Sequence, residues 1–239
     1  MSNIAIIFAG GTGKRMNTRS KPKQFLELHS KPILVYTLEK FNNHPDIDGI
    51  VLVILESWIE YCKDLVKKFR LSKIKAVVAG GDSALSSQRN GLLKVAELFS
   101  KDSIVLIHDG VRPLIDADTI MENINCVIKY GSAITVSPAT ETVTLFKSEN
   151  QIMDILDRKH CLIAKAPQCF YLNELLEAHR KAMNDNLYDF IDSGSLMKFY
   201  GHSLYTVMGK VENIKITTPA DFYIFRAILD ARENSQIFG

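Results

Sequence analysis

Short apolar runs alternate with amphipathic stretches along most of the chain. Between residues 4 and 136, runs rich in β-branched residues predict buried strands, and apolar residues recurring three and four positions apart predict helices. The predicted strands are 4–9, 50–54, 75–79, 103–107 and 133–136, and the predicted helices are 32–41, 58–69, 83–99 and 117–130. Strand alternating with helix at this spacing is typical of a mostly parallel sheet covered by helices on both faces.

The pattern changes after residue 138. Residues 142–146 and 152–156 flank a Lys-Ser-Glu-Asn turn and predict a β-hairpin that projects from the sheet, in an arm at about 139–165. An isolated hairpin is marginally stable in water, so we expect the arm to rest on a second copy of the chain in a homodimer. The predicted class is therefore α/β: a three-layer, Rossmann-like fold with a projecting hairpin arm.

Toward the C-terminus the patterns predict a further helix, two strands and a last helix. The helix lies at 173–183 and the strands at 203–207 and 213–217. The last helix begins at Thr218-Pro219-Ala220-Asp221, which supplies an N-cap, a proline at the first helical position and an acid two positions later. We expect one domain over residues 1–239, because that length suits a single large α/β domain.

Composition and charge exclude several classes of protein. The net charge of +2 is close to balance, which argues against a nucleic-acid partner bound through a basic face. No apolar stretch approaches the ~18 residues of a membrane span, and the N-terminal run is too short for a signal peptide. The four cysteines lack Cys-x-x-Cys or metal-ligand spacing, which is typical of free thiols in a reducing compartment. We expect a cytoplasmic protein without a membrane partner.

The first strand ends in a glycine cluster followed by cations. Gly10-Gly11-Thr12-Gly13-Lys14-Arg15 comes directly after it, and Lys23 lies in the same connection. Glycine lets backbone N–H groups converge on an anion, and adjacent cations complete a phosphate site. Neither the P-loop nor the dinucleotide fingerprint fits, because Arg15 follows Lys14 and Met16 stands where a third glycine belongs. The choice left is between a less common phosphate loop and a structural turn with solvated charges.

Two more strand ends carry candidate chemistry. Gly80-Gly81 follows the third predicted strand, and Asp109 follows the fourth. Ligands of parallel sheets bind at the carboxyl ends of strands, so these loops and the glycine cluster should share one cavity. A carboxylate placed like Asp109 suits Mg²⁺ that bridges to phosphate oxygens. The alternatives are that Asp109 caps the next turn and pairs with Arg112, and that the serines after Gly81 cap a helix.

Three of these stretches carry a family resemblance. Residues 9–16 with Pro22-Lys23-Gln24-Phe25, the run His108-Asp109-Gly110-Val111-Arg112-Pro113, and residues 213–217 resemble the motifs of cytidylyltransferases that act on methylerythritol phosphate or ribitol phosphate. The resemblance spans nearly the whole chain. It implies that CTP and a phosphorylated polyol react to a CDP-polyol and pyrophosphate, with Mg²⁺ or another divalent cation as cofactor. A phosphate monoester is already an anion near neutral pH, so no side-chain nucleophile is required.

The resemblance also implies roles for individual residues. The catalytic candidates are Arg15 and Lys23 on the triphosphate and Lys215 on the α-phosphate, although Lys215 could instead be the polar face of a strand. The nucleotide-binding candidates are Gly10, Gly11, Thr12, Gly13, Gly81, Ser87 and Asp109, with Asp109 also the metal ligand. The candidates for binding the acceptor are Gly110, Arg112, Thr142, Arg158 and Asp192. Arg158 would bind the acceptor phosphate from the arm, across a dimer.

The chain departs from the family pattern at three places. Ser83-Ala84 replaces an acidic-arginine pair, and Ala166-Pro167-Gln168 replaces Thr-Pro-Gln. Ile191-Asp192-Ser193-Gly194-Ser195 stands where the methylerythritol-phosphate enzymes have Thr-Asp-Glu-Ala-Ser, and isoleucine cannot donate the threonine's hydrogen bond. Together with the sequence of the first loop, Ala9-Gly10-Gly11-Thr12-Gly13, this difference favours D-ribitol 5-phosphate as the acceptor. The alternatives are 2-C-methyl-D-erythritol 4-phosphate and a non-catalytic nucleotide-binding relative, the latter favoured by Ala84, Ile191 and Ser193.

Overall fold

The structure is a computed structural model that describes residues 1–11 and 21–238, the side chains of 235–238 excepted. The strands are β1 (Asn3–Phe8), β2 (Glu27–Leu28), β3 (Lys31–Pro32), β4 (Gly49–Ile54), β5 (Ile74–Ala79), β6 (Ile104–Asp109), β7 (Ser132–Pro138), β8 (Val143–Ser148), β9 (Gln151–Leu156), β10 (Leu162–Tyr171) and β11 (Thr206–Met208). The α-helices are α1 (Ile33–Asn42), α2 (Ile59–Lys68), α3 (Ala84–Leu98), α4 (Ala117–Tyr130), α5 (Leu172–Asn184), α6 (Ser193–Phe199) and α7 (Pro219–Phe238). Short 3₁₀ helices are η2 (Lys23–Phe25), η3 (Glu56–Trp58) and η4 (Arg158–His160).

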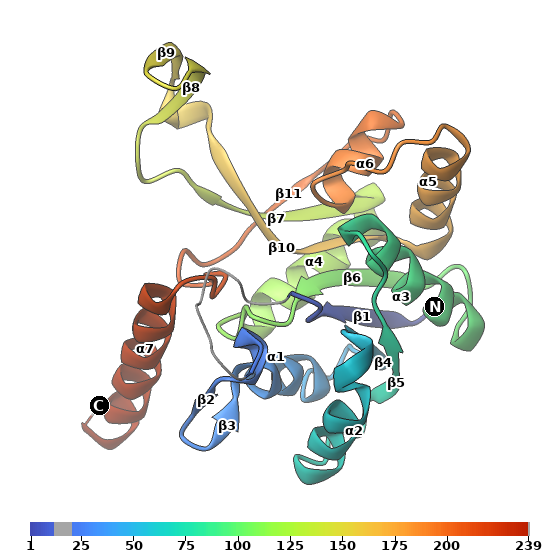
Figure 1. Cartoon of the computed structure of the whole chain (residues 1–239), viewed down its shortest axis with the longest axis vertical. Helices are drawn as coiled ribbons and strands as arrows, with labels where there is room; N and C mark the ends of the chain where they lie inside the picture. The colour runs from blue at the N-terminus through green and yellow to red at the C-terminus, as the bar shows by residue number, and fades with distance from the viewer. Residues whose placement is uncertain (12–20, 239) are drawn as a thin grey trace.

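The central sheet has the strand order β11-β7-β10-β6-β1-β4-β5 (Figure 1). Its pairs are parallel except those of β10, which runs antiparallel to both β6 and β7. The predicted mostly parallel sheet is therefore confirmed. Because Phe8 at the end of β1 is in register with Val53 of β4 and Asp109 of β6, three carboxyl ends lie side by side.

Helices cover both faces of this sheet. In β1, Ala5 and Ile7 face the core formed with α1, α2 and α4, while Ile4 and Ile6 face the core formed with α3, α5 and α6. Side chains of β4 and β6 alternate between the two cores in the same way. Burial on both faces explains why the central strands read as continuous apolar runs rather than as an alternation of apolar and polar residues.

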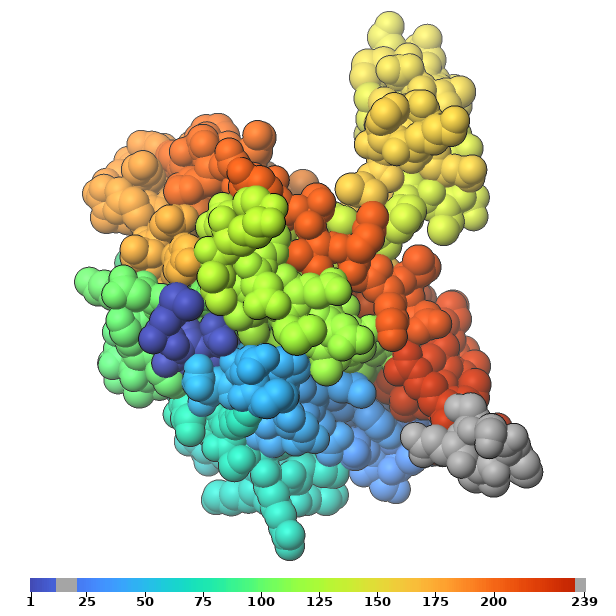
Figure 2. Space-filling view, turned by 180° about the vertical axis from the view of Figure 1, so that it is seen from behind, coloured from blue at the N-terminus to red at the C-terminus, as the bar shows by residue number. Residues whose placement is uncertain are grey.

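The predicted hairpin arm is present. β8 and β9 pair only with each other among the described strands, in a two-stranded antiparallel sheet. Figure 2 shows this pair standing clear of the rest of the molecule. Large apolar side chains remain exposed on it, with Phe146 81% and Ile155 61% accessible.

The sequence analysis missed β10 and α6, and also the two-residue strands β2 and β3. β10 returns from the arm into the sheet, but its first half is exposed and it contains Pro167, which disfavours a central strand. The strand accommodates this proline at an irregularity: the register shifts between Ala164 and Gln168. The short helix α6 spans only Ser193–Phe199, which is too brief for a helical periodicity to stand out.

One predicted strand is wrong, and another is displaced. Residues 213–217 have no strand pairing; they form an extended segment in which the Ile216 N–H donates to the Val111 carbonyl at 2.9 Å. Its side chains still alternate, since Ile216 is fully buried and Lys215 is on the other side. The strand expected at 203–207 is β11, displaced toward the C-terminus.

The last helix begins where its capping residues predicted. The Asp221 carboxylate accepts hydrogen bonds from the N–H groups of Thr217 and Thr218, at 2.8 and 2.7 Å. Phe225 of α7 packs with Ile216 in a third apolar cluster that includes Leu28. This helix therefore secures the segment that carries Lys215. Within the described residues, no helix combines the length and apolar character needed to cross a bilayer.

Candidate active site

A cavity of about 690 Å³ opens at the carboxyl ends of β1, β5 and β6. Its volume is that of a pocket for a small organic ligand. The lining residues from the three predicted loops are Gly10 and Gly11, then Gly81, Asp82, Ser83, Ala84, Ser87 and Gln88, then His108, Asp109, Val111 and Arg112. Lys23, Lys165, Gln168, Ile191, Asp192, Ser193 and Lys215 complete most of the wall. The prediction that these loops share one cavity is confirmed.

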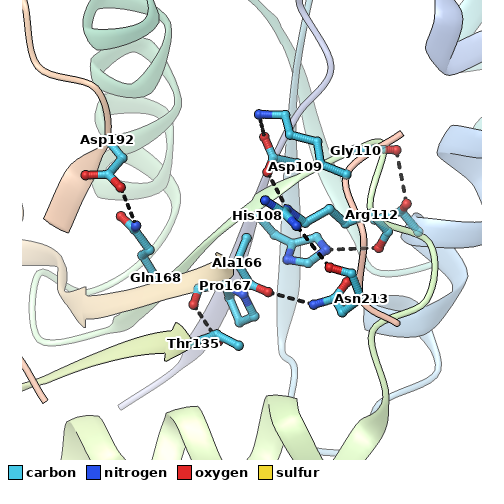
Figure 3. A network of polar contacts seen from close by, with 12 residues as sticks. His108, Asp109, Gly110, Arg112, Thr135, Ala166, Pro167, Gln168, Asp192 and Asn213 are labelled. Carbon is cyan, nitrogen blue, oxygen red and sulfur yellow. Dashed lines mark hydrogen bonds and ion pairs between the residues drawn. The ribbon is translucent and has the colours of Figure 1, made fainter. Parts of the chain in front are cut away.

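Asp109 is the acid at the centre of this site (Figure 3). Its Oδ1 lies 2.7 Å from Lys215 Nζ, and its Oδ2 lies 2.8 Å from Arg112 Nε. Burial alone would raise the pKa of this carboxyl, but the two cations outweigh it and lower the pKa to about 2. Asp109 is therefore fully ionised at neutral pH, with a quarter of its side chain exposed to the cavity.

A hydrogen-bond network fixes the segment that presents Lys215. Arg112 Nη1 donates to the Asn213 carbonyl at 3.0 Å, and Asn213 Nδ2 donates to the Ala166 carbonyl at 2.9 Å (Figure 3). Residues 213–217 are thus tied to both β10 and the loop after β6. The ion pair between Asp109 and Arg112, which was the structural alternative at this loop, is present, and Asp109 also lines the cavity.

His108 supports the same loop from inside the protein. Its side chain is buried, its ring packs on Phe41 with centroids 4.9 Å apart, and its Nε2 lies 3.2 Å from the Arg112 carbonyl. Burial lowers the pKa of His108 to about 4, although the neighbouring Asp109 acts in the opposite direction. The imidazole is therefore neutral at physiological pH.

The glycine loop reaches the cavity in its described part. Gly10 has open space where a side chain would begin, and Gly11 lies next to the Lys23 side chain. Gln24 is buried beside Lys23 and donates from Nε2 to the Ala9 carbonyl, which anchors η2 to the end of β1. The predicted residues Thr12, Gly13 and Arg15 lie outside the described residues.

The loop after β5 both caps a helix and lines the cavity. Ser83 caps α3 by accepting from the Ser86 N–H at 3.0 Å, so the serines do cap a helix. Gly81 and Ser87 also line the cavity, where the Gly81 N–H donates to Ser87 Oγ at 3.0 Å. A Cβ on Gly81 would come within 2.3 Å of Ser86 Oγ, so only glycine fits this turn.

Asp192 lines the opposite wall and has a structural task there. Its Oδ1 accepts from the Ser195 N–H at 2.8 Å, which caps α6, and its Oδ2 accepts from Gln168 Nε2 at 2.7 Å. Ser193 donates from Oγ to Gln88 Oε1 at 2.9 Å, joining α6 to α3. The replacement of the family's glutamate by Ser193 therefore creates a buried contact, whereas Ile191 is 91% exposed at the rim.

Three predicted acceptor-binding residues lie away from the cavity wall. Gly110 is buried behind it, where its N–H donates to the Phe8 carbonyl and a Cβ would come within 2.9 Å of Leu34. Thr142 precedes β8 on the arm and is exposed. Arg158 is at the arm's base and donates from Nη1 to the Thr140 carbonyl at 3.0 Å. Within one copy, Thr142 and Arg158 are not among the cavity-lining residues.

Sequence reasoning missed Lys165 and Gln88 as cavity residues. Gln88 stood inside a predicted helix, and its partner Ser193 is distant in sequence. Lys165 fell at the end of the predicted arm, directly before Ala166-Pro167-Gln168. That motif was the available signal, because a proline inside a strand marks an irregularity at which the alternation of side chains is interrupted.

Asp109 offers one oxygen donor of the kind that a divalent cation takes. Mg²⁺ binds oxygen ligands, keeps several waters and typically takes one or two carboxylates besides substrate phosphates, and Asp109 is an ionised carboxylate facing the cavity. Among the described residues, the one His, Cys and carboxylate cluster with metal-like spacing is His29, Asp230 and Glu233. It lies between the β2–β3 turn and α7, outside the cavity lining.

Comparisons with known proteins place the chain among nucleotide-transferring enzymes. Residues 3–231 match the family model described as IspD, 2-C-methyl-D-erythritol 4-phosphate cytidylyltransferase. A ribitol-5-phosphate cytidylyltransferase of Vibrio parahaemolyticus is 51% identical over 99% of this chain and 100% of its own length. A 2-C-methyl-D-erythritol 4-phosphate cytidylyltransferase of Clostridium botulinum is 41% identical over 95% of this chain and 97% of its own. The crystal structure of 4-diphosphocytidyl-2C-methyl-D-erythritol synthase from Anaerococcus prevotii superposes with a TM-score of 0.82 at 27% identity, covering 96% of each chain.

Proposed function

The chain belongs to the IspD family of cytidylyltransferases, and we propose that it transfers the cytidylyl group of CTP to D-ribitol 5-phosphate. Cytidylyl transfer is the activity named for the family model and for the similar proteins. The choice of acceptor is carried by one observation. Over almost the whole chain, identity is 51% to ribitol-5-phosphate enzymes of two genera and 41% to a methylerythritol-phosphate enzyme.

The geometry supports this chemistry. An oxygen of the acceptor phosphate attacks the α-phosphorus of CTP; a P–O bond forms, the bond to the β-phosphate bridging oxygen breaks, and pyrophosphate leaves with the electron pair. The reaction brings two anions together, so it requires fixed positive charge more than a general base. Lys23 and Lys215 line the cavity, and Asp109 and the hydrogen-bonded segment 213–217 hold Lys215 in place.

We assign the charged residues as follows. Lys23 and the backbone of Gly10 and Gly11 bind the triphosphate, and Lys215 stabilises charge on the α-phosphate. Arg112 orients the acceptor. Asp109 would hold Mg²⁺, which when bound supplies charge neutralisation on the phosphate oxygens. Arg15, Thr12 and Gly13 belong to this proposal on the strength of the sequence alone.

We further propose a homodimer formed through the β8–β9 arm. The arm exposes Phe146, Ile152, Met153 and Ile155, each at least 58% accessible. A two-stranded hairpin with this much exposed apolar surface becomes stable when another protein surface covers it. A partner's arm would also bring Thr142 and Arg158 toward the acceptor end of the cavity, where one copy leaves them distant.

The acceptor is tested by pyrophosphate release with CTP and a panel of phosphates. D-Ribitol 5-phosphate should give the largest kcat/KM, and 2-C-methyl-D-erythritol 4-phosphate should give at least tenfold less. Preference for the methylerythritol phosphate would overturn the acceptor. Binding of CTP without turnover of any acceptor would instead identify a non-catalytic relative.

The nucleotide end is tested with Lys23→Ala. Loss of one charged donor on the developing pyrophosphate should lower kcat by about 10²- to 10³-fold, while the protein remains folded at the assay temperature. Lys101→Ala is the matched control, because Lys101 is an exposed lysine before β6, outside the cavity lining. A wild-type kcat in the Lys23 variant would remove Lys23 from the mechanism.

A further inference from the structure

An irregularity in β10 directs Lys165 to the cavity. Ala164 is in register with Val136 of β7, and Gln168 with Ile134, so three residues of β10 stand opposite the single residue Thr135. Bulges of this kind re-aim side chains and are enriched beside functional sites. Two carbonyls freed by the irregularity have side-chain partners: the Ala166 carbonyl accepts from Asn213, and the Pro167 carbonyl accepts from Thr135 Oγ1 at 2.7 Å (Figure 3).

The ammonium of Lys165 contacts backbone carbonyls. Nζ donates to the Val211 carbonyl at 2.7 Å and lies 3.4 Å from the Lys210 carbonyl. It forms no ion pair with a carboxylate of the described residues, whereas Arg112 and Lys215 both pair with Asp109. An ammonium has three donors, so carbonyl contacts alone leave both its charge and a donor for a ligand.

The local charge around Lys165 is positive. Among the described residues of the cavity wall are four cations, Lys23, Arg112, Lys165 and Lys215, and three carboxylates, Asp82, Asp109 and Asp192, and the cations Arg112 and Lys215 both pair with Asp109. Partial burial lowers the pKa of Lys165, and the positive charge of Arg112 lowers it further. A dianion placed among these cations would offset both effects. A phosphate monoester carries close to two negative charges at pH 7.

The order of the strands indicates which substrate phosphate lies near Lys165. The glycine loop follows β1, Asp109 ends β6, and Lys165 lies on β10, and these three strands are neighbours in the order β10-β6-β1. Neighbouring strands are about 4.8 Å apart, so β10 is about 10 Å from the strand that leads to the triphosphate loop. Lys165 is therefore placed on the far side of Asp109 and Lys215 from that loop.

From this arrangement we propose that Lys165 binds the phosphate monoester of the acceptor, as a specificity-determining residue next to Arg112. The inference rests on the proposed function, because it takes the acceptor to be a phosphorylated polyol. It assigns the three neighbouring strands in order: the end of β1 to the triphosphate, the end of β6 to the reacting centre and the irregularity of β10 to the attacking phosphate.

The test compares Lys165→Gln and Lys165→Arg with Lys198→Gln, an exposed lysine of α6 that does not line the cavity. With D-ribitol 5-phosphate as acceptor, Lys165→Gln should raise the acceptor KM about 10- to 100-fold, the effect of losing one charge-assisted hydrogen bond. The KM for CTP should change less than threefold. Lys165→Arg, which keeps the charge, should restore most of the acceptor affinity, and Lys198→Gln should match the wild type.

Two kinetic results would overturn the proposal. A rise in the KM for CTP alone would place Lys165 on the nucleotide. A fall in kcat with both KM values unchanged would show that Lys165 acts only by holding the Val211 carbonyl. Titration calorimetry with inorganic phosphate separates this inference from the acceptor assignment: weaker phosphate binding by Lys165→Gln supports the site even if the wild type does not turn over D-ribitol 5-phosphate, and unchanged binding contradicts it.

Discussion

Replacing Asp109 by asparagine tests the centre of the site most directly. Asparagine keeps the shape of the side chain but removes the charge that holds Lys215 Nζ at 2.7 Å and Arg112 Nε at 2.8 Å. The pKa of Asp109 is lowered from 3.8 to about 2, and each pKa unit corresponds to about 1.4 kcal/mol. Allowing for the exposed quarter of the side chain, the ionised carboxylate stabilises the fold by about 2 kcal/mol at pH 7.

The loss should be visible in both stability and rate. For a chain of this size, about 2 kcal/mol corresponds to a fall in melting temperature of about 4–8 °C. The kcat for pyrophosphate release should fall by about 10²-fold or more, because the variant loses its proposed metal ligand and leaves Lys215 unanchored. Because the pKa of Asp109 is lowered, its contribution to stability is present above pH 3.8 and is lost as the pH falls toward 2.

Differential scanning fluorimetry and a coupled pyrophosphate assay measure the two effects. Asp102→Asn is the control, because Asp102 is an exposed acid just before the opposite end of β6. If Asp109→Asn melts within 1 °C of the wild type, on the order of 0.5 kcal/mol, the electrostatic account of the pair is refuted. If its kcat is unchanged with Mg²⁺ present, Asp109 is not the metal ligand.

Three further predictions concern the surrounding structure. Burial lowers the pKa of both His108 and His179 to about 4, so the folded state resists protonation of these histidines. As the pH falls from 6.5 to 4, the free energy of unfolding should therefore fall by about 1.4 kcal/mol per histidine per pH unit. Urea titrations at a series of pH values should show this dependence, and His179→Leu should show about half the slope. Gly110→Ala places a Cβ within 2.9 Å of a Leu34 methyl and should cost about 1–3 kcal/mol of stability in urea denaturation, whereas an unchanged midpoint would mean that the loop yields freely. Phe146→Glu should shift the protein from dimer to monomer in light scattering, and a dimer that persists in this variant would argue against the arm as the interface.

Much of the fold was predictable because its signals are local. Strands buried on both faces read as apolar runs, and the cap at Thr218 and Asp221 marked the start of α7. The glycine cluster and the ends of β5 and β6 pointed to a common site, since carboxyl ends of parallel strands meet at one edge of a sheet. Pairing of Asp109 with Arg112 also followed from their closeness in the chain.

Contacts between distant segments could not be deduced this way. Sequence periodicity does not reveal that β10 enters between β6 and β7, that residues 213–217 cross the site without strand pairing, or that Ser193 meets Gln88. These features depend on tertiary packing: Phe225 of α7 packs with Ile216, and the β10 irregularity turns Lys165 to the cavity. The strands and the loops at their carboxyl ends were thus predictable from local signals, namely burial and glycine geometry. That Lys215 joins Arg112 at Asp109 was decided only when segments about 100 residues apart folded against each other, because the free energy of those contacts is absent until both segments are in place.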